Sequence, residues 1–190
     1  MVSISRRALL AAAGLGALGA TGAVVWAQSA LTSFERAGEE PLVLGDRGPA
    51  PELTGIEGWL NSEPLALSRL AGRPVLLDFW TFDCINCVRT LPHVRKWHSA
   101  YAERGLAVIG VHSPEFPHER KRERVAAAAA RYGVDYPIAL DTDHATWDAY
   151  GVRYWPSLFL IDQRGRIVMR HEGEGEYATI ERLIQTVLTR

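Results

Sequence analysis

The two cysteines of the chain lie three positions apart, as Cys84-Ile85-Asn86-Cys87. Two thiols at this spacing can close a disulfide between themselves and exchange it with a disulfide of another molecule. The same spacing occurs in zinc sites, but a site of four thiolates needs a second pair of cysteines, which the sequence lacks. The pair therefore predicts thiol–disulfide exchange and no metal site.

The residues around the pair predict a strand followed by a helix. Residues 74–80 form an apolar run typical of a buried strand, and from Cys84 to about residue 104 apolar residues recur every three or four positions. At the first turn of a helix, unpaired N–H groups and the helix dipole stabilise a thiolate. We therefore expect Cys84 to be the nucleophile, and Cys87, one turn later, to resolve the mixed disulfide.

Three further features fit this chemistry. Asp78 interrupts the apolar strand six residues before the first cysteine, where a buried carboxyl group is costly unless it handles protons. Burial should raise its pKa and allow it to accept the proton of Cys87. Pro92 lies inside the predicted helix and should kink it. Trp155-Pro156 precedes a predicted strand, and a cis proline there would leave neighbouring backbone groups free to bind an extended substrate.

Beyond this unit, predicted strands and helices alternate, which indicates a partly parallel sheet. The patterns predict strands at residues 106–111, 136–140, 158–161 and 167–170, and helices at 119–132, 144–150 and 177–188. The predicted fold class is α/β, with a mixed central sheet flanked by helices.

Residues 1–27 have the order of an export signal. Arg6 and Arg7 precede an uncharged stretch of small and apolar residues, 8–25, as a basic region precedes an apolar one in signal peptides. The paired arginines resemble a twin-arginine signal, and cleavage is expected after Ala27. The alternative is an uncleaved signal that tethers the protein to the membrane.

The remaining residues divide into a linker and one folded domain. Residues 28–52 contain several Gly and Pro residues without an apolar period, so we predict a linker, followed by the domain at 53–190. The 190 residues include 21 Lys and Arg against 22 Asp and Glu, which argues against nucleic-acid binding. We expect a monomer in the periplasm or cell envelope.

Several of these residues together resemble the thioredoxin superfamily over about residues 53–190. Asp78, Cys84, Cys87, Pro92 and Pro156 correspond to its buried acid, its two active-site cysteines, its helix proline and its cis-proline. The segment between the strands predicted at 106–111 and 136–140 resembles the redoxin/TlpA-like branch. Residues 79–81, 84–93 and 110–116 are similar to the periplasmic thioredoxin-like domain of DipZ proteins.

The resemblance implies a thioredoxin fold with a strand-helix insert, in a thiol-disulfide oxidoreductase that needs no cofactor. Its substrates would be protein thiols and disulfides, bound near Trp155 and Pro156. An exported reductase also needs electrons from across the membrane, so the resemblance implies a membrane electron donor of the CcdA type.

Two departures from the family pattern bear on the direction of electron flow. Ile85-Asn86 replaces the familiar Gly-Pro, and Asp83 replaces the familiar Trp. We expect Asp83 to be the N-cap of the helix, and a charge so near the sulfur would disfavour the thiolate by about 1 kcal/mol. Oxidants of this superfamily rely on a strongly stabilised thiolate, so Asp83 favours a reductant.

Three alternatives remain open at this point. A thiol peroxidase of the peroxiredoxin type would use Thr81, but such sites resemble Pro-X-X-X-Thr-X-X-Cys, and Leu77 stands at the proline position. A copper-delivery protein of this fold would use both cysteines and a histidine, although those proteins typically space the cysteines by three residues. A redox-inert peptide-binding domain is disfavoured, because both cysteines and the acid are present.

Overall fold

The apolar run before the cysteines forms strand β2 (Val75–Trp80) at the centre of the computed structural model, which describes residues 43–190. The sheet has six strands in the order β1-β4-β3-β2-β5-β6. Strand β2 pairs in parallel with β3 and antiparallel with β5, so the sheet is mixed, as predicted. The other strands are β1 (Gly58–Leu60), β3 (Ala107–His112), β4 (Ile138–Leu140), β5 (Ser157–Ile161) and β6 (Ile167–Glu172).

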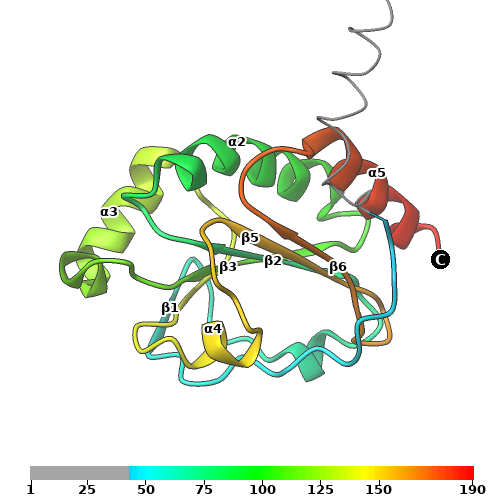
Figure 1. Ribbon diagram of the computed structural model, residues 1–190, viewed down its shortest axis with the longest axis horizontal. Helices are drawn as coiled ribbons and strands as arrows, with labels where there is room; N and C mark the ends of the chain where they lie inside the picture. The colour runs from blue at the N-terminus through cyan, green and yellow to red at the C-terminus, as the bar shows by residue number, and fades with distance from the viewer. Residues whose placement is uncertain (1–42) are drawn as a thin grey trace, which may run out of the picture. The chain divides into compact units, whose positions relative to one another are not determined.

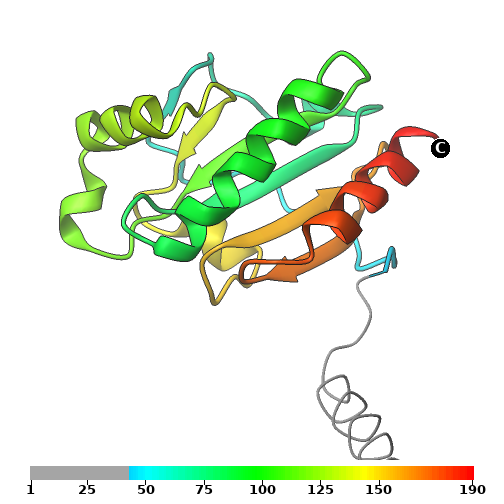
Figure 2. The same cartoon turned by 90° about the horizontal axis from the view of Figure 1, so that it is seen from above.

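Helices cover both faces of this sheet (Figure 1). Helices α2, α3 and α5 lie over one face, as the view from above also shows (Figure 2), and α4 lies under the other. Their bounds are α2 (Ile85–Tyr101), α3 (Arg122–Tyr132), α4 (Ala145–Ala149) and α5 (Tyr177–Leu188). Within the described residues, no helix is both long enough and apolar enough to cross a membrane.

Strand β2 supplies both hydrophobic cores because its side chains alternate between the two faces of the sheet. Leu76 and Trp80 belong to the core beneath α2 and α5, whereas Leu77 and Phe79 belong to the core on the side of α4. Asp78 has the same parity as Leu76 and Trp80. The alternation therefore directs its carboxyl group towards α2, the helix that begins beside the cysteines.

Helix α2 has the predicted register. Its buried side chains include Cys87, Leu91, Val94 and Trp97, which recur every three or four residues and so form one face. Pro92 lies inside the helix and lacks the N–H that would bond to the carbonyl group four residues earlier.

The helix predicted at 119–132 is wrong at its start. Its first residues form a separate 3₁₀ helix, Pro117–Arg120, and α3 begins only at Arg122, after an extended Lys121. The cause is Glu119, whose buried carboxylate binds backbone N–H groups of its own turn. The predicted end is confirmed, because Gly133 closes α3 in the left-handed conformation, with φ of 67°.

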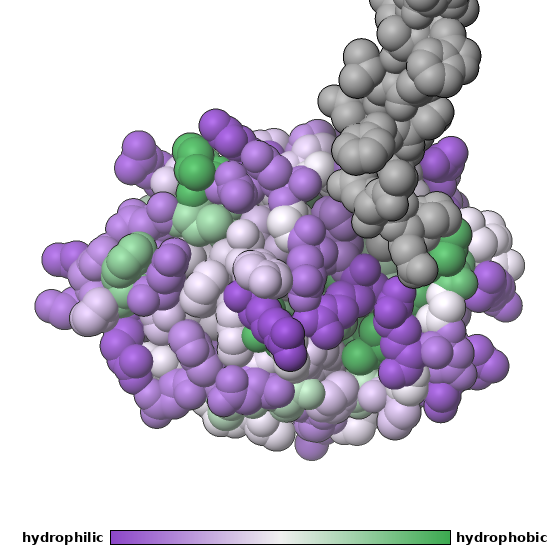
Figure 3. All heavy atoms as spheres, viewed as in Figure 1, coloured by the Kyte–Doolittle hydropathy of each residue, from purple (hydrophilic) through white to green (hydrophobic). Residues whose placement is uncertain are grey.

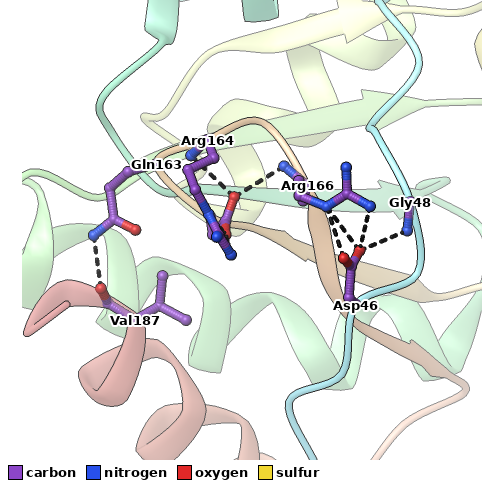
Figure 4. Close-up of polar contacts among 7 residues, drawn as sticks. Asp46, Gly48, Gln163, Arg164, Arg166 and Val187 are labelled. Atoms are coloured by element: carbon purple, nitrogen blue, oxygen red, sulfur yellow. Dashed lines mark hydrogen bonds and ion pairs between the residues drawn. The ribbon is translucent and has the colours of Figure 1, made fainter.

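The described part of the predicted linker is bonded to the sheet. The N–H groups of Gly45 and Arg47 donate to Val168 and Ile167 of β6, at 2.8 and 2.9 Å. Asp46 forms an ion pair with Arg166 at 2.8 Å (Figure 4). The compact unit therefore extends to the N-terminal side of residue 53. The predicted signal, residues 1–27, lies outside the described residues.

The β5–β6 turn anchors this segment and the last helix together (Figure 4). Asp162 accepts hydrogen bonds from the backbone N–H groups of Arg164 and Arg166, at 3.0 and 2.9 Å. Gln163 donates from its side chain to the carbonyl group of Val187 in α5, at 2.7 Å. The turn therefore fixes the end of the sheet opposite the cysteine pair.

Gly110 of β3 is expected to tolerate no side chain, because it pairs with Asp78 in the sheet under two large rings. A Cβ atom there would lie 3.0 Å from Nε1 of Trp80 and 3.1 Å from the ring of Tyr136. A Gly110→Ala variant should lose about 1–3 kcal/mol of unfolding free energy in urea. Gly45→Ala is the control, because its Cβ meets nothing within 4 Å, and it should change stability by less than about 0.5 kcal/mol. Equal stability of both variants would contradict this account of the packing.

Candidate active site

Cys84 is the N-cap residue of α2, and its sulfur accepts a hydrogen bond from the N–H of Cys87 at 3.3 Å. The side chain is partly exposed and reduced. The thiol of Cys87 hydrogen-bonds to this sulfur and, with the N–H groups of Cys87 and Asn86, lowers the pKa of Cys84 to about 7 despite partial burial. A thiolate at Cys84 is therefore well populated at neutral pH.

Cys87 has the opposite environment, one turn into the helix. It is only 1% exposed, and burial raises its pKa far above the ordinary value, with a further contribution from the hydrogen bond to Cys84. Cys87 therefore stays protonated while Cys84 ionises. This asymmetry matches the predicted division between an attacking and a resolving cysteine.

Asp78 lies buried behind the pair. Its Oδ2 accepts a hydrogen bond from the hydroxyl group of Tyr136 at 3.3 Å, and its Oδ1 has no partner among the described residues. Burial raises the pKa of Asp78 to about 7, against the opposing effect of Tyr136. The charge of Asp78 also raises the pKa of Cys87, so the two groups interact electrostatically, as expected for a proton acceptor and its donor.

The peptide bond between Trp155 and Pro156 is cis. The indole of Trp155 points inward, because it donates to the carbonyl group of Ser113 at 2.9 Å and packs 4.1 Å from the ring of Trp147. The carbonyl group of Pro156 accepts from the N–H of Gly173 at 2.8 Å. The backbone N–H and C=O of Trp155 make no hydrogen bond within residues 43–190. The side chain of Trp155 is thus held inside the domain by these contacts.

Asp83 is not the N-cap of α2, contrary to the prediction. Its carboxylate instead lies 2.5 Å from Nε2 of His118, and the N-cap position belongs to Cys84 because the chain enters the helix one residue later. The charge of a different acid, Glu115, raises the pKa of Cys84. The predicted N-cap role of Asp83 is therefore wrong, and the predicted effect of its charge on the Cys84 thiolate stays a prediction.

A buried network beside the cysteine pair was not predicted from the sequence. Glu119 is fully buried, and its carboxylate accepts hydrogen bonds from the hydroxyl group of Thr81 and from the N–H of Asp83. The hydroxyl of Thr81 also lies 3.3 Å from Nε2 of His112, a ring whose pKa burial lowers to about 4. In sequence, Glu119 had the pattern of a solvent-facing acid near a helix start, so no local signal could reveal its burial.

Two alternatives gain no support from this geometry. A peroxidase of the peroxiredoxin type would direct Thr81 towards the reactive cysteine, whereas here the Thr81 hydroxyl bonds to Glu119 and His112. For metal delivery, the part of the chain that the structure describes contains no group of three or more His, Cys, Asp or Glu side chains that could hold an ion.

Comparisons with known proteins agree on the fold and the chemistry. A model of the AhpC/TSA family matches residues 44–170. Protein DipZ of Mycobacterium tuberculosis is 49% identical over 144 residues, which are 74% of this chain but only 21% of DipZ. The thiol-disulfide oxidoreductase YkuV of Bacillus subtilis is 30% identical over 142 residues, 75% of this chain and 95% of YkuV.

Solved structures agree as well. The thioredoxin-like superfamily protein SPOA0173 superposes with a TM-score of 0.70 at 28% identity, over 75% of this chain and 97% of that one. A thiol-disulfide isomerase of Corynebacterium glutamicum gives 0.68 at 27% identity, over 74% and 97%. The predicted thioredoxin fold is confirmed.

Proposed function

The chain belongs to the AhpC/TSA family and has the fold of the thiol-disulfide oxidoreductases, and we propose that it reduces protein disulfides through Cys84 and Cys87. The observation that carries the proposal is the asymmetry of the pair. Cys84 is partly exposed and its sulfur accepts a hydrogen bond at the start of α2, whereas Cys87 is buried. Cys84 can therefore attack a substrate disulfide, and Cys87 reacts only after the mixed disulfide has formed.

The reaction consists of two exchanges. The Cys84 thiolate attacks one sulfur of the substrate disulfide, so that the substrate S–S bond breaks, a mixed disulfide forms, and the other substrate sulfur leaves as a thiolate. Cys87 then loses its proton to Asp78 and attacks the sulfur of Cys84. The second substrate sulfur leaves, and the products are a reduced substrate and a disulfide between Cys84 and Cys87.

The ionisation of Cys84 supports the reducing direction. Its pKa of about 7 is similar to that of thioredoxin, also about 7, whereas the strong oxidant DsbA has a pKa of about 3.5 at its reactive cysteine. A thiolate that is only moderately stabilised makes the dithiol form a better electron donor. The pKa of Cys84 therefore supports the same direction that the sequence predicted.

An extended protein segment is the substrate that the surface favours. Only a few large apolar side chains are exposed among the described residues, and they include Ile85 at 60%, Phe116 at 46% and Tyr154 at 60%. Ile85 lies between the two cysteines, and Phe116 lies in the insert between β3 and β4. Tyr154 directly precedes Trp155 and the cis proline. The face seen in Figure 3 is largely hydrophilic, with small separate apolar patches. The unpaired backbone of Trp155 could hydrogen-bond the segment while these side chains pack against it.

We place the protein outside the cytoplasm, in the periplasm or cell envelope, as a monomer. The support for export is the signal-like order of residues 1–27 and the twin arginines Arg6 and Arg7. After each turnover the cysteine disulfide must be reduced again, so a membrane electron donor of the CcdA type is the proposed partner. The chain needs no bound cofactor for either exchange.

The redox potential of the cysteine pair tests this function. In glutathione or dithiothreitol buffers, the purified protein lacking residues 1–27 should equilibrate below about −230 mV, towards the thioredoxin value of about −270 mV. The reduced protein should also reduce the disulfides of insulin. A potential near −120 mV, similar to that of DsbA, would instead make this an oxidase that forms disulfides.

A further inference from the structure

Among the side chains of the insert between β3 and β4 that contact the cysteine loop, Glu119 is fully buried. Its Oε1 accepts from the hydroxyl group of Thr81 and, at 3.1 Å, from the N–H of Asp83. Its Oε2 accepts from the N–H groups of Glu115 and Phe116, both at 2.7 Å. One fully buried carboxylate therefore binds two segments that lie more than thirty residues apart in sequence.

The hydrogen bonds fix the protons of this network. A hydroxyl group has a single proton, and Thr81 donates it to Glu119. Nε2 of His112, 3.3 Å away, must then carry a proton and donate it to the Thr81 oxygen. This arrangement agrees with a neutral imidazole, since burial lowers the pKa of His112 to about 4. The single polar atom of the Thr81 side chain, its hydroxyl oxygen, is thus bonded to Glu119 of the insert and to His112 at the end of β3.

The same threonine also contacts the redox pair through its backbone. The N–H of Thr81 interacts with the sulfur of Cys87 and lowers the pKa of that thiol. Asp83, the other loop residue that Glu119 binds, directly precedes Cys84. Glu119 therefore binds two residues of the short segment that joins β2 to Cys84.

We propose that Glu119 is a positioning residue, which acts through Thr81 and Asp83 to hold the cysteine loop in the conformation that stabilises the Cys84 thiolate. The carboxylate geometry is essential, because four donors converge on two oxygen atoms. Glutamine offers one oxygen, and its NH₂ group would face two donors. The proposal rests on the proposed function only in taking Cys84 as the attacking thiol.

The test is the pH dependence of Cys84 alkylation by iodoacetamide in the reduced full chain, with the modified cysteine identified by mass spectrometry. Thr81→Val keeps the shape of the side chain and the charge of Glu119, but removes the hydrogen bond. We expect its alkylation midpoint to rise by about one pH unit, which is about a tenfold loss of thiolate below that midpoint. Thr81→Ser restores the hydroxyl group and should behave like the wild type.

Glu119→Gln separates positioning from simple electrostatics. If Glu119 acted only through its negative charge, its removal would lower the alkylation midpoint, and Thr81→Val would change nothing. Positioning predicts that both variants raise the midpoint. Should Glu119→Gln fail to fold, Thr81→Val and Thr81→Ser still decide the question.

A matched control separates positioning from general loss of stability. Thr146 in α4 is as fully buried as Thr81. Its hydroxyl group donates to the carbonyl group of Thr54 at 2.7 Å. Thr146→Val should lower the unfolding temperature as Thr81→Val does, without changing the alkylation midpoint. An unchanged midpoint in Thr81→Val, or an equal rise in Thr146→Val, would overturn the proposal. Neither result would contradict the proposed function, because alkylation of Cys84 does not involve a protein substrate.

Discussion

Replacing Cys84 with serine should lower the rate of disulfide reduction by about 10³-fold or more. A serine hydroxyl group is not ionised near neutral pH and cannot form a disulfide. Wild-type Cys84, whose pKa is about 7, supplies a thiolate under the same conditions. Reduction of insulin, followed by turbidity at pH 7, measures the loss.

Replacing Cys87 with serine should instead stop the reaction after its first exchange. Cys84 can still attack, but no second thiol remains to release the substrate, so a one-to-one mixed disulfide accumulates. The adduct is detected on a non-reducing gel and disappears with dithiothreitol. An adduct formed by Cys84→Ser and absent from Cys87→Ser would reverse the assigned roles of the two cysteines.

An Asp78→Asn variant is expected to be slower but more stable than the wild type. The amide cannot accept the proton of Cys87, so release of the mixed disulfide should slow by about 10²-fold. Asparagine still offers an oxygen to the hydroxyl group of Tyr136, which lies 3.3 Å from the carboxylate. The substitution therefore removes the buried charge and retains the hydrogen bond.

The gain in stability should depend on pH. The pKa of Asp78 is raised from 3.8 to about 7 in the folded protein. Near pH 3 the carboxyl group is protonated in both the folded and the unfolded state, so it does not lower the free energy of unfolding. As the pH rises from about 4 to 7, the unfolded chain releases this proton first, so the wild type loses stability. Above pH 7 the loss is constant, at about 4 kcal/mol.

Urea unfolding of the reduced proteins at several pH values measures this difference. The stability curves of the wild type and Asp78→Asn should converge near pH 4 and separate as the pH approaches 7. The exposed Asp148 provides the control, because Asp148→Asn should stay within about 0.5 kcal/mol of the wild type throughout. Parallel curves for Asp78→Asn would mean that the carboxyl group does not titrate as assigned.

Local sequence patterns were enough to find the redox pair and the strand and helix that flank it. The continuous apolar run of β2, which is buried at all six positions, and the period of three to four in α2 are properties of each element alone, so they place Cys84 at a helix start and Asp78 in the strand before it. The same residues, together with Pro92 and Pro156, carry the resemblance to the thioredoxin superfamily, which implied the fold. The short strand β1 (Gly58–Leu60) was not predicted, because three residues are too few to establish a period of hydrophobic residues.

What the sequence by itself determined is therefore the type of chemistry at Cys84 and Cys87, since the Cys-X-X-Cys spacing and the start of the helix lie within one local segment. The tertiary structure alone decided how the surrounding charges pair. Thr81 meets Glu119 across 38 positions, Asp83 meets His118 across 35, and Asp46 meets Arg166 across 120. Such partners are brought together by the path of the whole chain, and a local pattern cannot tell a buried carboxylate with four donors from an acid in water.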